Sequence, residues 1–466
     1  MSTAPAVLLV LLGIIAPSGH AQVPELEALS STWQPVRICR PAAGNLLPCP
    51  AGAGLDPSAC ADYGCCHDGG AQCFLPNGDD RLVAGSQEVF AANQAVPAIA
   101  QPGAALAVDS GGDLLGIECF DAPPFAGTCG PQAFGSLSID GVHSAALATA
   151  LSTRWSPHQI ARNATLWRPG GGELRGTSSV RMGFDSQVVL MRLELEALSP
   201  NQAPVNLSIS LAAFILAQTG GWAWPIERPQ GADGMVCSIR RNAAGAVTVH
   251  VGSNTSSVSA FSQGTPVPVL TMQSAAVLAS WPALQMKQGE PIVIELALAV
   301  GRGGPTGIEQ KVDAVVLDFT SAWVAAATDW SDWWHSAFDP SVHAVRQQAG
   351  RRGLGAAVTF EGQLPTLTSS DEALKRTYYM GAVTLLTMAR HDIVPGSKWE
   401  GKMCFGSAGV EFAFAAMYIW DTTLNSLLLT LLVPSYFQSM IEAWLGMGIH
   451  QHYAVDYVSN NGIGPW

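Results

Sequence analysis

The chain has 466 residues, of which 48% are hydrophobic and only 13% charged, and its formal net charge is −13. A chain this apolar has enough hydrophobic surface to fold, which excludes disorder as its main state. Its 23 Lys and Arg residues are thinly spread, whereas nucleic-acid binding needs them clustered, so a neutral ligand is the better fit. At about 100 to 200 residues per domain, we expect two to four domains.

The first 21 residues predict a signal peptide. Residues 7–16 form an apolar run, which is too short to cross a bilayer because a spanning helix needs about 20 residues. Gly19 and Ala21 then supply the small side chains that precede a signal-peptidase cleavage site. We therefore expect an exported protein, either secreted or in the lumen of the secretory pathway.

We expect no membrane span later in the chain. The most apolar stretch, residues 412–433, is interrupted by Trp420, Asp421 and Asn425. A central Asp costs about 2.5 to 3.5 kcal/mol on scales that measure helix insertion into membranes. The stretch therefore predicts a buried helix.

Six of the ten cysteines lie within 35 residues, namely Cys39, Cys49, Cys60, Cys65, Cys66 and Cys73. In an exported chain this density predicts a disulfide framework. A zinc site is the alternative, but the adjacent pair Cys65 and Cys66 lacks the two-residue spacing of a zinc knuckle. The spacing alone leaves fifteen connectivities open.

The order and spacing of these cysteines resemble the P-type (trefoil) domain, which we place at 36–78. The Gly64-Cys65-Cys66 step and the closing Cys73-Phe74 are the most specific features, and His67 stands where the family usually has Trp. The resemblance implies pairing of the first cysteine with the fifth, the second with the fourth and the third with the sixth. In this chain those bridges are Cys39–Cys66, Cys49–Cys65 and Cys60–Cys73.

The remaining four cysteines lie outside this module. Cys119 and Cys129 flank a Pro-rich loop, and we expect them to pair with each other. The sequence assigns no partner to Cys237 or Cys404.

Residues 83–327 predict an all-β sandwich. Short runs with apolar residues at every second position alternate with Gly, Pro and Asn, as at 187–195, 206–211 and 246–251. Three Asn-X-Ser/Thr sequons begin at Asn163, Asn206 and Asn254, and we expect them in surface loops if the chain is exported.

After residue 327 the apolar residues recur at the spacing of an α-helix. Residues 328–364 predict a Trp-rich amphipathic linker, and residues 370–390 a helix with Ser370 as its N-cap. Two more helices are expected near 421–429 and 436–445.

Residues from about 330 to 466 look like the start of a six-hairpin (α/α)₆ glycoside hydrolase, of the glucosidase and trehalase-like group that includes processing α-glucosidase. A β-sandwich comes first in both. The motifs that follow here are Trp330-x-x-Trp333-Trp334, Leu374-x-x-x-Tyr378-Tyr379, Trp420-Asp421 and the run from His452 to Tyr457. The resemblance places the beginning of such a toroid at 365–466. About four of its roughly twelve helices are covered, so we expect either a fragment or a degenerate relative.

This resemblance implies a carbohydrate site. Trp420 would stack on a sugar ring, and Asp421 would hydrogen-bond its hydroxyls or act as an acid. Asp421 also suits a helix N-cap, so its role stays open between the two. Asp456 is the second catalytic candidate, in a polar loop at a helix end, with Tyr453 nearby as a substrate-binding residue.

No cofactor or metal is expected. His391, His450 and His452 do not have the spacing of a recognisable ligand set. Two functions remain: a secreted glycosidase that hydrolyses glucose-type glycans by acid and base catalysis, or a non-catalytic secreted protein, glycan-binding or structural, that carries a trefoil module.

Overall fold

The computed structural model describes the chain in segments, which are residues 66–67, 73–74, 98–101, 104–108, 112–122, 125–168, 172–183, 188–200, 203–212, 236–241, 247–252, 257–263, 265–273, 276–299, 304–338, 360–367, 369–390, 404–405, 416–446, 448, 450–456 and 461–463. The predicted signal peptide and most of the predicted P-type domain lie outside these residues. Within that domain, β1 (Cys66–His67) and β2 (Cys73–Phe74) pair antiparallel. The trefoil module and its three bridges remain predictions.

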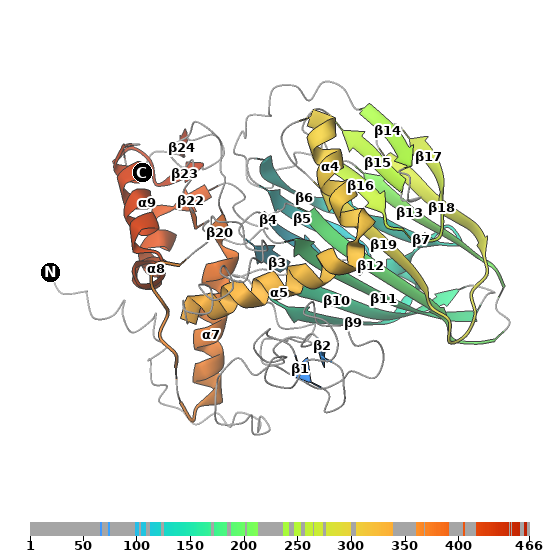
Figure 1. Ribbon diagram of the computed structural model, residues 1–466, viewed down its shortest axis with the longest axis horizontal. Helices are drawn as coiled ribbons and strands as arrows, with labels where there is room; N and C mark the ends of the chain where they lie inside the picture. Colours follow the sequence, from blue (N-terminus) through green and yellow to red (C-terminus); the bar gives the residue numbers. More distant parts are fainter. Residues whose placement is uncertain are drawn as a thin grey trace.

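Antiparallel sheets fill the middle of the chain (Figure 1), as the alternating sequence pattern predicts. The largest has eight strands in the order β14 (Val236–Arg241), β15 (Val247–Gly252), β16 (Ser257–Phe261), β19 (Ile292–Ala299), β12 (Val188–Ala197), β11 (Gly172–Gly183), β10 (Gln159–Arg168) and β9 (Ala148–Ser156). A five-stranded sheet has the order β17 (Val269–Gln273), β18 (Ala276–Leu284), β13 (Val205–Ala212), β7 (Ser136–Ile139) and β8 (Val142–His143). A four-stranded sheet consists of β3 (Ala98–Gln101), β4 (Ala104–Val108), β5 (Ile117–Ala122) and β6 (Phe125–Phe134). The one-turn helix α3 (Ser144–Leu147) joins β8 to β9.

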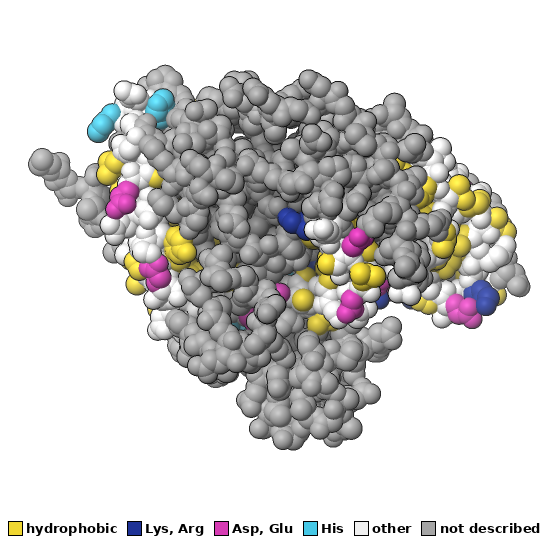
Figure 2. Space-filling model, turned by 45° about the horizontal axis from the view of Figure 1, so that its top comes forward, with side chains coloured by type: hydrophobic (Ala, Val, Ile, Leu, Met, Phe, Trp, Pro, Cys, Tyr) yellow, Lys and Arg dark blue, Asp and Glu magenta, His cyan; other side chains and the backbone are white. Residues whose placement is uncertain are grey.

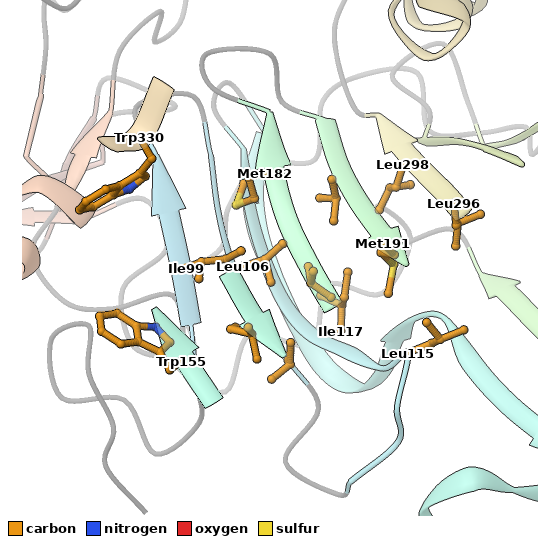
Figure 3. Packing of buried hydrophobic residues seen from close by; sticks show 14 of the residues in the cluster. Ile99, Leu106, Leu115, Ile117, Trp155, Met182, Met191, Leu296, Leu298 and Trp330 are labelled. Atoms are coloured by element: carbon orange, nitrogen blue, oxygen red, sulfur yellow. The ribbon is translucent and has the colours of Figure 1, made fainter. Parts of the chain in front are cut away.

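Successive side chains of a strand point to opposite faces of its sheet, so each strand has an inner row of side chains. The inner rows of these sheets pack together in one hydrophobic core. In β10, for example, burial alternates residue by residue along the strand. Figure 3 shows Ile99, Leu106 and Ile117 of the four-stranded sheet gathered with Met182 and Met191 of the eight-stranded sheet.

Two of the three sequons can be placed on this frame. Asn163 and Asn206 are exposed, but they lie on strands β10 and β13 and not in the loops that we expected. An alternating strand exposes one face as fully as a loop would, which explains the difference. Asn254 lies outside the described residues.

Helices cover the second face of the eight-stranded sheet. In β12, Val189 and Met191 belong to the core between the sheets, whereas Val188 and Leu190 pack against α4 (Gly304–Leu317) and α5 (Phe319–Phe338). The described strands of the sandwich thus end at Ala299, and helix begins at Gly304, earlier than the boundary of 327 that the sequence suggested. The apolar residues of 304–327 are spaced as in a helix. They are buried because they pack against a face of the sheet.

Arg181 fastens α5 to the sheet. Its Nη1 donates to the Trp323 carbonyl oxygen at 2.6 Å, and its guanidinium lies 4.4 Å from the centre of the Trp323 ring. Its Nε donates to Gln159 at 2.7 Å. The guanidinium is buried, so these three contacts replace the water that it loses.

The predicted Trp-rich linker begins as helix. Trp330, Trp333 and Trp334 all lie in the last turns of α5 and are buried. Trp333 stacks on Phe360 with ring centroids 5.8 Å apart, and Trp334 meets Tyr379 edge to face at 6.2 Å. The Trp-x-x-Trp-Trp motif is therefore core packing that joins the sandwich to the helices after it.

The C-terminal helices lie beside the sandwich (Figure 1) and are α7 (Glu372–Thr387), α8 (Ile419–Leu432) and α9 (Pro434–Gly446). Asp371 is the N-cap of α7, in place of the expected Ser370, because its carboxylate accepts from the Leu374 backbone N–H at 3.1 Å. A short pair, β20 (Ala389–Arg390) with β21 (Cys404–Phe405), follows α7. None of the described helices is long and apolar enough to cross a membrane.

Candidate functional site

Helix α8 begins at the end of a strand that belongs to a small antiparallel sheet. Strand β22 (Ala416–Tyr418) runs straight into the helix and pairs with β23 (Ala454–Asp456), which pairs in turn with β24 (Asn461–Ile463). The Ile419 backbone N–H donates to the Tyr453 carbonyl oxygen at 3.2 Å. This register brings Tyr453 beside the first turn of α8.

Three aromatic rings meet there, and we call Tyr418, Trp420 and Tyr453 the aromatic cluster. The ring centroids are 5.0 Å apart for Tyr418 and Trp420, 5.6 Å for Trp420 and Tyr453, and 6.1 Å for the two tyrosines. The angles between their planes are 22°, 20° and 2°. In a linear stack the two outer rings would be about twice as far apart as neighbouring rings. The three distances between ring centroids are instead similar, so the near-parallel rings lie offset from one another. Trp420 keeps 45% of its surface exposed.

The phenol of Tyr418 is held in its neutral form. Its partial burial raises its pKa, and the neighbouring Tyr453 and Asp421 raise it further, because each disfavours a phenolate. At neutral pH Tyr418 is therefore a hydrogen-bond donor as well as an acceptor.

Asp421 lies in the first turn of α8, two residues inside the helix. The N-cap position belongs to Tyr418, whose side chain makes no capping hydrogen bond. The N-cap alternative for Asp421 is thus wrong, because the helix begins earlier than the sequence pattern suggested. A carboxylate in the first turn interacts favourably with the partial positive charge of a helix N-terminus. The Asn425 amide donates to the Asp421 carbonyl oxygen at 3.0 Å.

Asp456 belongs to strand β23, where it lies opposite Ala416 of β22 and Asn461 of β24. It is not in a polar loop at a helix end, as we had expected, because pairing with β22 and β24 makes this segment a central strand. Its backbone shares a sheet with Tyr418. Its catalytic role remains a prediction.

The described residues contain no group of three or more His, Cys, Asp and Glu side chains that could hold a metal ion. His391 lies outside the described residues, and His450 and His452 stand in the turn before β23.

Tyr418 is the member of the cluster that sequence analysis missed. A usable signal was present, because Tyr418 stands two residues before Trp420 at the junction of a strand and a helix. Only the pairing of β22 with β23 shows that both rings lie next to Tyr453.

No family model and no curated protein matches the chain. Among solved structures, one described as "Putative kojibiose phosphorylase from human microbiome" aligns with 9% identity and a TM-score of 0.45 over 70% of this chain and 42% of that one. A bacterial glucoamylase complexed with acarbose aligns with 8% identity and a TM-score of 0.40 over 82% of this chain and 56% of that one. Both names are those of carbohydrate-active enzymes, and the chain spans about half the length of each. Both TM-scores are below 0.5, so the chemistry of the site rests on its own geometry.

Proposed function

We propose that the protein binds carbohydrate at the aromatic cluster. The observation that carries this proposal is the exposed ring of Trp420, supported by two tyrosines and followed by a carboxylate in the first turn of a helix. Sugars present an apolar face of C–H groups edged by hydroxyls, so a sugar site combines a flat aromatic surface with a few polar groups.

Each residue then has a defined task. Trp420 stacks against the pyranose ring, and Tyr453 and Tyr418 hold the indole in place from beside it. The neutral phenol of Tyr418 and the carboxylate of Asp421 hydrogen-bond to hydroxyl groups. Because the chain carries a formal charge of −13, a neutral glycan suits it better than an anionic one.

The more specific form of the proposal is a glycoside hydrolase of the six-hairpin type, exported, acting on glucose-type glycans. Inverting hydrolysis needs an acid and a base whose carboxyl groups lie about 6.5 to 9.5 Å apart. We nominate Asp421 and Asp456, which both come from the unit of β22, α8 and β23.

Non-catalytic glycan binding is the second candidate, and the position of Asp421 favours it. A helix N-terminus stabilises the charged carboxylate, which suits hydrogen bonding to hydroxyls. A general acid must instead hold its proton until it meets the leaving group.

Binding can be tested with two exposed tryptophans. Trp420→Ala should weaken the binding of a maltooligosaccharide series about tenfold or more in calorimetric titration, a loss on the scale of one buried aromatic contact. Trp167→Ala is the matched control, because Trp167 is 51% exposed on β10, away from the cluster. Equal losses in both variants, or none in Trp420→Ala, would rule out this site.

Turnover separates the two candidates. On a panel of nitrophenyl glycosides, a hydrolase should release nitrophenol, and Asp421→Asn or Asp456→Asn should abolish that release while the chain still folds. Sugar binding with no release from any substrate would leave a glycan-binding protein.

A further inference from the structure

Helix α8, which carries part of the candidate site, and the following helix α9 expose an unusual amount of apolar surface. Twelve large hydrophobic side chains are exposed among the described residues, and six of them lie on α8 and α9 with 38% to 61% of their surface exposed. They are Trp420, Leu424, Leu427, Leu431, Ile441 and Leu445. Figure 2 shows hydrophobic side chains at the surface on the side of the molecule where these helices lie. We call these six residues the apolar face.

Charge is nearly absent from the same helices. Residues 419–446 contain two charged side chains, Asp421 and Glu442, and no Lys, Arg or His. A helix that faces water normally carries charged residues on its outer side. Contiguous apolar patches of about 300 to 600 Å² on a monomer are often functional, so a row of exposed apolar side chains with little charge beside it is a candidate interaction surface.

The spacing of the apolar face on α8 indicates what covers it. Trp420, Leu424, Leu427 and Leu431 follow one another at intervals of four, three and four residues. These are the intervals of a coiled-coil seam, and the opposite side of the helix, with Thr422, Leu429 and Leu432, is buried in this chain's own core. The intervals also read the same in both directions, about a midpoint between residues 425 and 426.

A seam with this symmetry is complementary to itself. When two copies of α8 lie antiparallel about a two-fold axis, Leu424 of each copy faces Leu427 of the other, and Trp420 faces Leu431. The same patch then serves on both subunits, as in the two-fold dimers that dominate soluble oligomers. The copies meet where neither carries a cluster of like charges, although each is strongly acidic overall.

We propose that the apolar face is covered by a second copy of this chain, with α8 of the two copies paired antiparallel. Ile441 and Leu445 of α9 extend the contact, and the exposed polar residues Thr423, Thr430 and Gln438 form its rim. A stable interface buries about 800 Å² on each partner, so the pairing has to include this polar rim as well as the apolar face. A membrane surface is disfavoured, because helices that lie on membranes are rich in Lys and Arg and these have none.

The inference does not depend on the proposed sugar site, but Trp420 belongs to both. Stacking of a sugar and pairing with a second copy would use the same exposed face of this ring. The two events should therefore compete, so that saturating sugar shifts the protein toward the monomer. A variant that abolishes pairing leaves the aromatic cluster intact, which keeps failure of one proposal distinct from failure of the other.

Light scattering coupled to size-exclusion chromatography tests the pairing with the full chain over a hundredfold range of concentration. We expect a dimer for the parent, and Leu427→Glu should weaken dimerisation at least tenfold because it puts two carboxylates into the seam. Leu317→Glu is the matched control, since Leu317 is 56% exposed at the end of α4, away from the apolar face. A monomeric parent, or a dimer that survives Leu427→Glu, would overturn the proposal.

Crosslinking tests the antiparallel arrangement without disturbing the fold by charge. The double variant Leu424→Cys/Leu427→Cys should form a covalent dimer under mild oxidation, whereas Leu424→Cys alone should not. Efficient crosslinking of the single variant would mean that the helices run parallel and would refute the two-fold seam. Flotation of a monomeric parent with phosphatidylcholine vesicles, lost in Leu427→Glu, would show that lipid and not a second copy covers the face.

Discussion

The indole of Trp420 and the phenol of Tyr453 stack with their ring centroids 5.6 Å apart and 20° between their planes. Trp420 comes from the first turn of α8, and Tyr453 from the turn before β23, 33 residues later. The hydrogen bond from the Ile419 N–H to the Tyr453 carbonyl oxygen fixes their separation. Each ring therefore limits the orientations that the other can adopt.

We predict that the two rings act as one unit in sugar binding. Tyr453→Ala should weaken binding although Tyr453 need not touch the sugar, because Trp420 loses the ring that positions it. In a double-mutant cycle measured by calorimetry, Tyr453→Ala and Trp420→Ala should show a coupling free energy of about 0.5 to 1.5 kcal/mol. Additive losses would mean that Tyr453 does not position Trp420.

The candidate site shows where prediction from sequence succeeds and where it ends. Trp420 and Asp421 could be singled out because an aromatic residue beside a carboxylate at a helix start is a local pattern. Tyr418 stands two residues before Trp420, but its importance comes from the pairing of β22 with β23, a contact between residues far apart in the chain. The structure brings Trp420 and Tyr453 together, whereas their role in binding sugar remains to be tested.

Some elements of the fold can likewise be predicted from the sequence, whereas others cannot. The strands of the sandwich follow from apolar residues at every second position, which is a property of each segment alone. Helices α4 and α5 were missed because Ala297 and Ala299, whose small side chains let a helix approach the sheet, are informative only once α4 is known to pack there. Burial of Trp333 by Phe360 is likewise a tertiary contact.

A close backbone approach leaves no room for a side chain at Gly362 unless the backbone shifts. The N–H groups of Glu361 and Gly362 both donate to the Leu432 carbonyl oxygen at 3.1 Å, and a Cβ on Gly362 would lie closer than 3.0 Å to the Leu431 carbonyl oxygen. Gly362→Ala should therefore lower the free energy of unfolding by about 1 to 3 kcal/mol, the usual cost of overpacking. The urea midpoint of the helical circular-dichroism signal measures this loss.

Gly381 provides the control for that substitution. It lies exposed within α7, and a Cβ there would meet no atom within 4 Å. Gly381→Ala should raise the free energy of unfolding by about 0.5 to 1 kcal/mol, since alanine loses less backbone entropy in a helix than glycine. A neutral Gly362→Ala beside a stabilising Gly381→Ala would show that the backbone at residue 362 can move away.

His158 should make the protein sensitive to acid. Burial, and then the nearby Arg181 cation, lowers the pKa of His158 from 6.5 to about 3. Between these two pH values the unfolded chain binds a proton that the folded chain does not, so the free energy of unfolding falls as the pH falls. This group contributes up to about 1.4 kcal/mol per pH unit.

Urea unfolding at a series of pH values between 7 and 3 measures that slope. His158→Gln should reduce the slope by the contribution of about one bound proton. An identical slope in the His158→Gln variant and the parent would show that His158 takes up its proton without opposing the fold.

The register of the four-stranded sheet bears on the cysteines. Cys119 of β5 lies directly opposite Cys129 of β6, whereas Cys237 of β14 lies opposite Val251. Residues directly opposite in an antiparallel pair have Cα atoms about 4.5 to 5.5 Å apart, which is within the range that a disulfide spans. We therefore predict a Cys119–Cys129 bridge when the chain is made in an oxidising compartment.

Peptide mapping by mass spectrometry of protein secreted from eukaryotic cells, with and without reduction, tests for this bridge. A linked pair of peptides containing Cys119 and Cys129 should appear only without reduction. The double variant Cys119→Ser/Cys129→Ser should lose about 2 to 3 kcal/mol of unfolding free energy, as expected for a short closed loop. Complete alkylation of both thiols in unreduced protein would contradict the bridge, and it would also argue against the export that the first 21 residues predict, because oxidation of a pair held this close is the expected outcome in the secretory pathway.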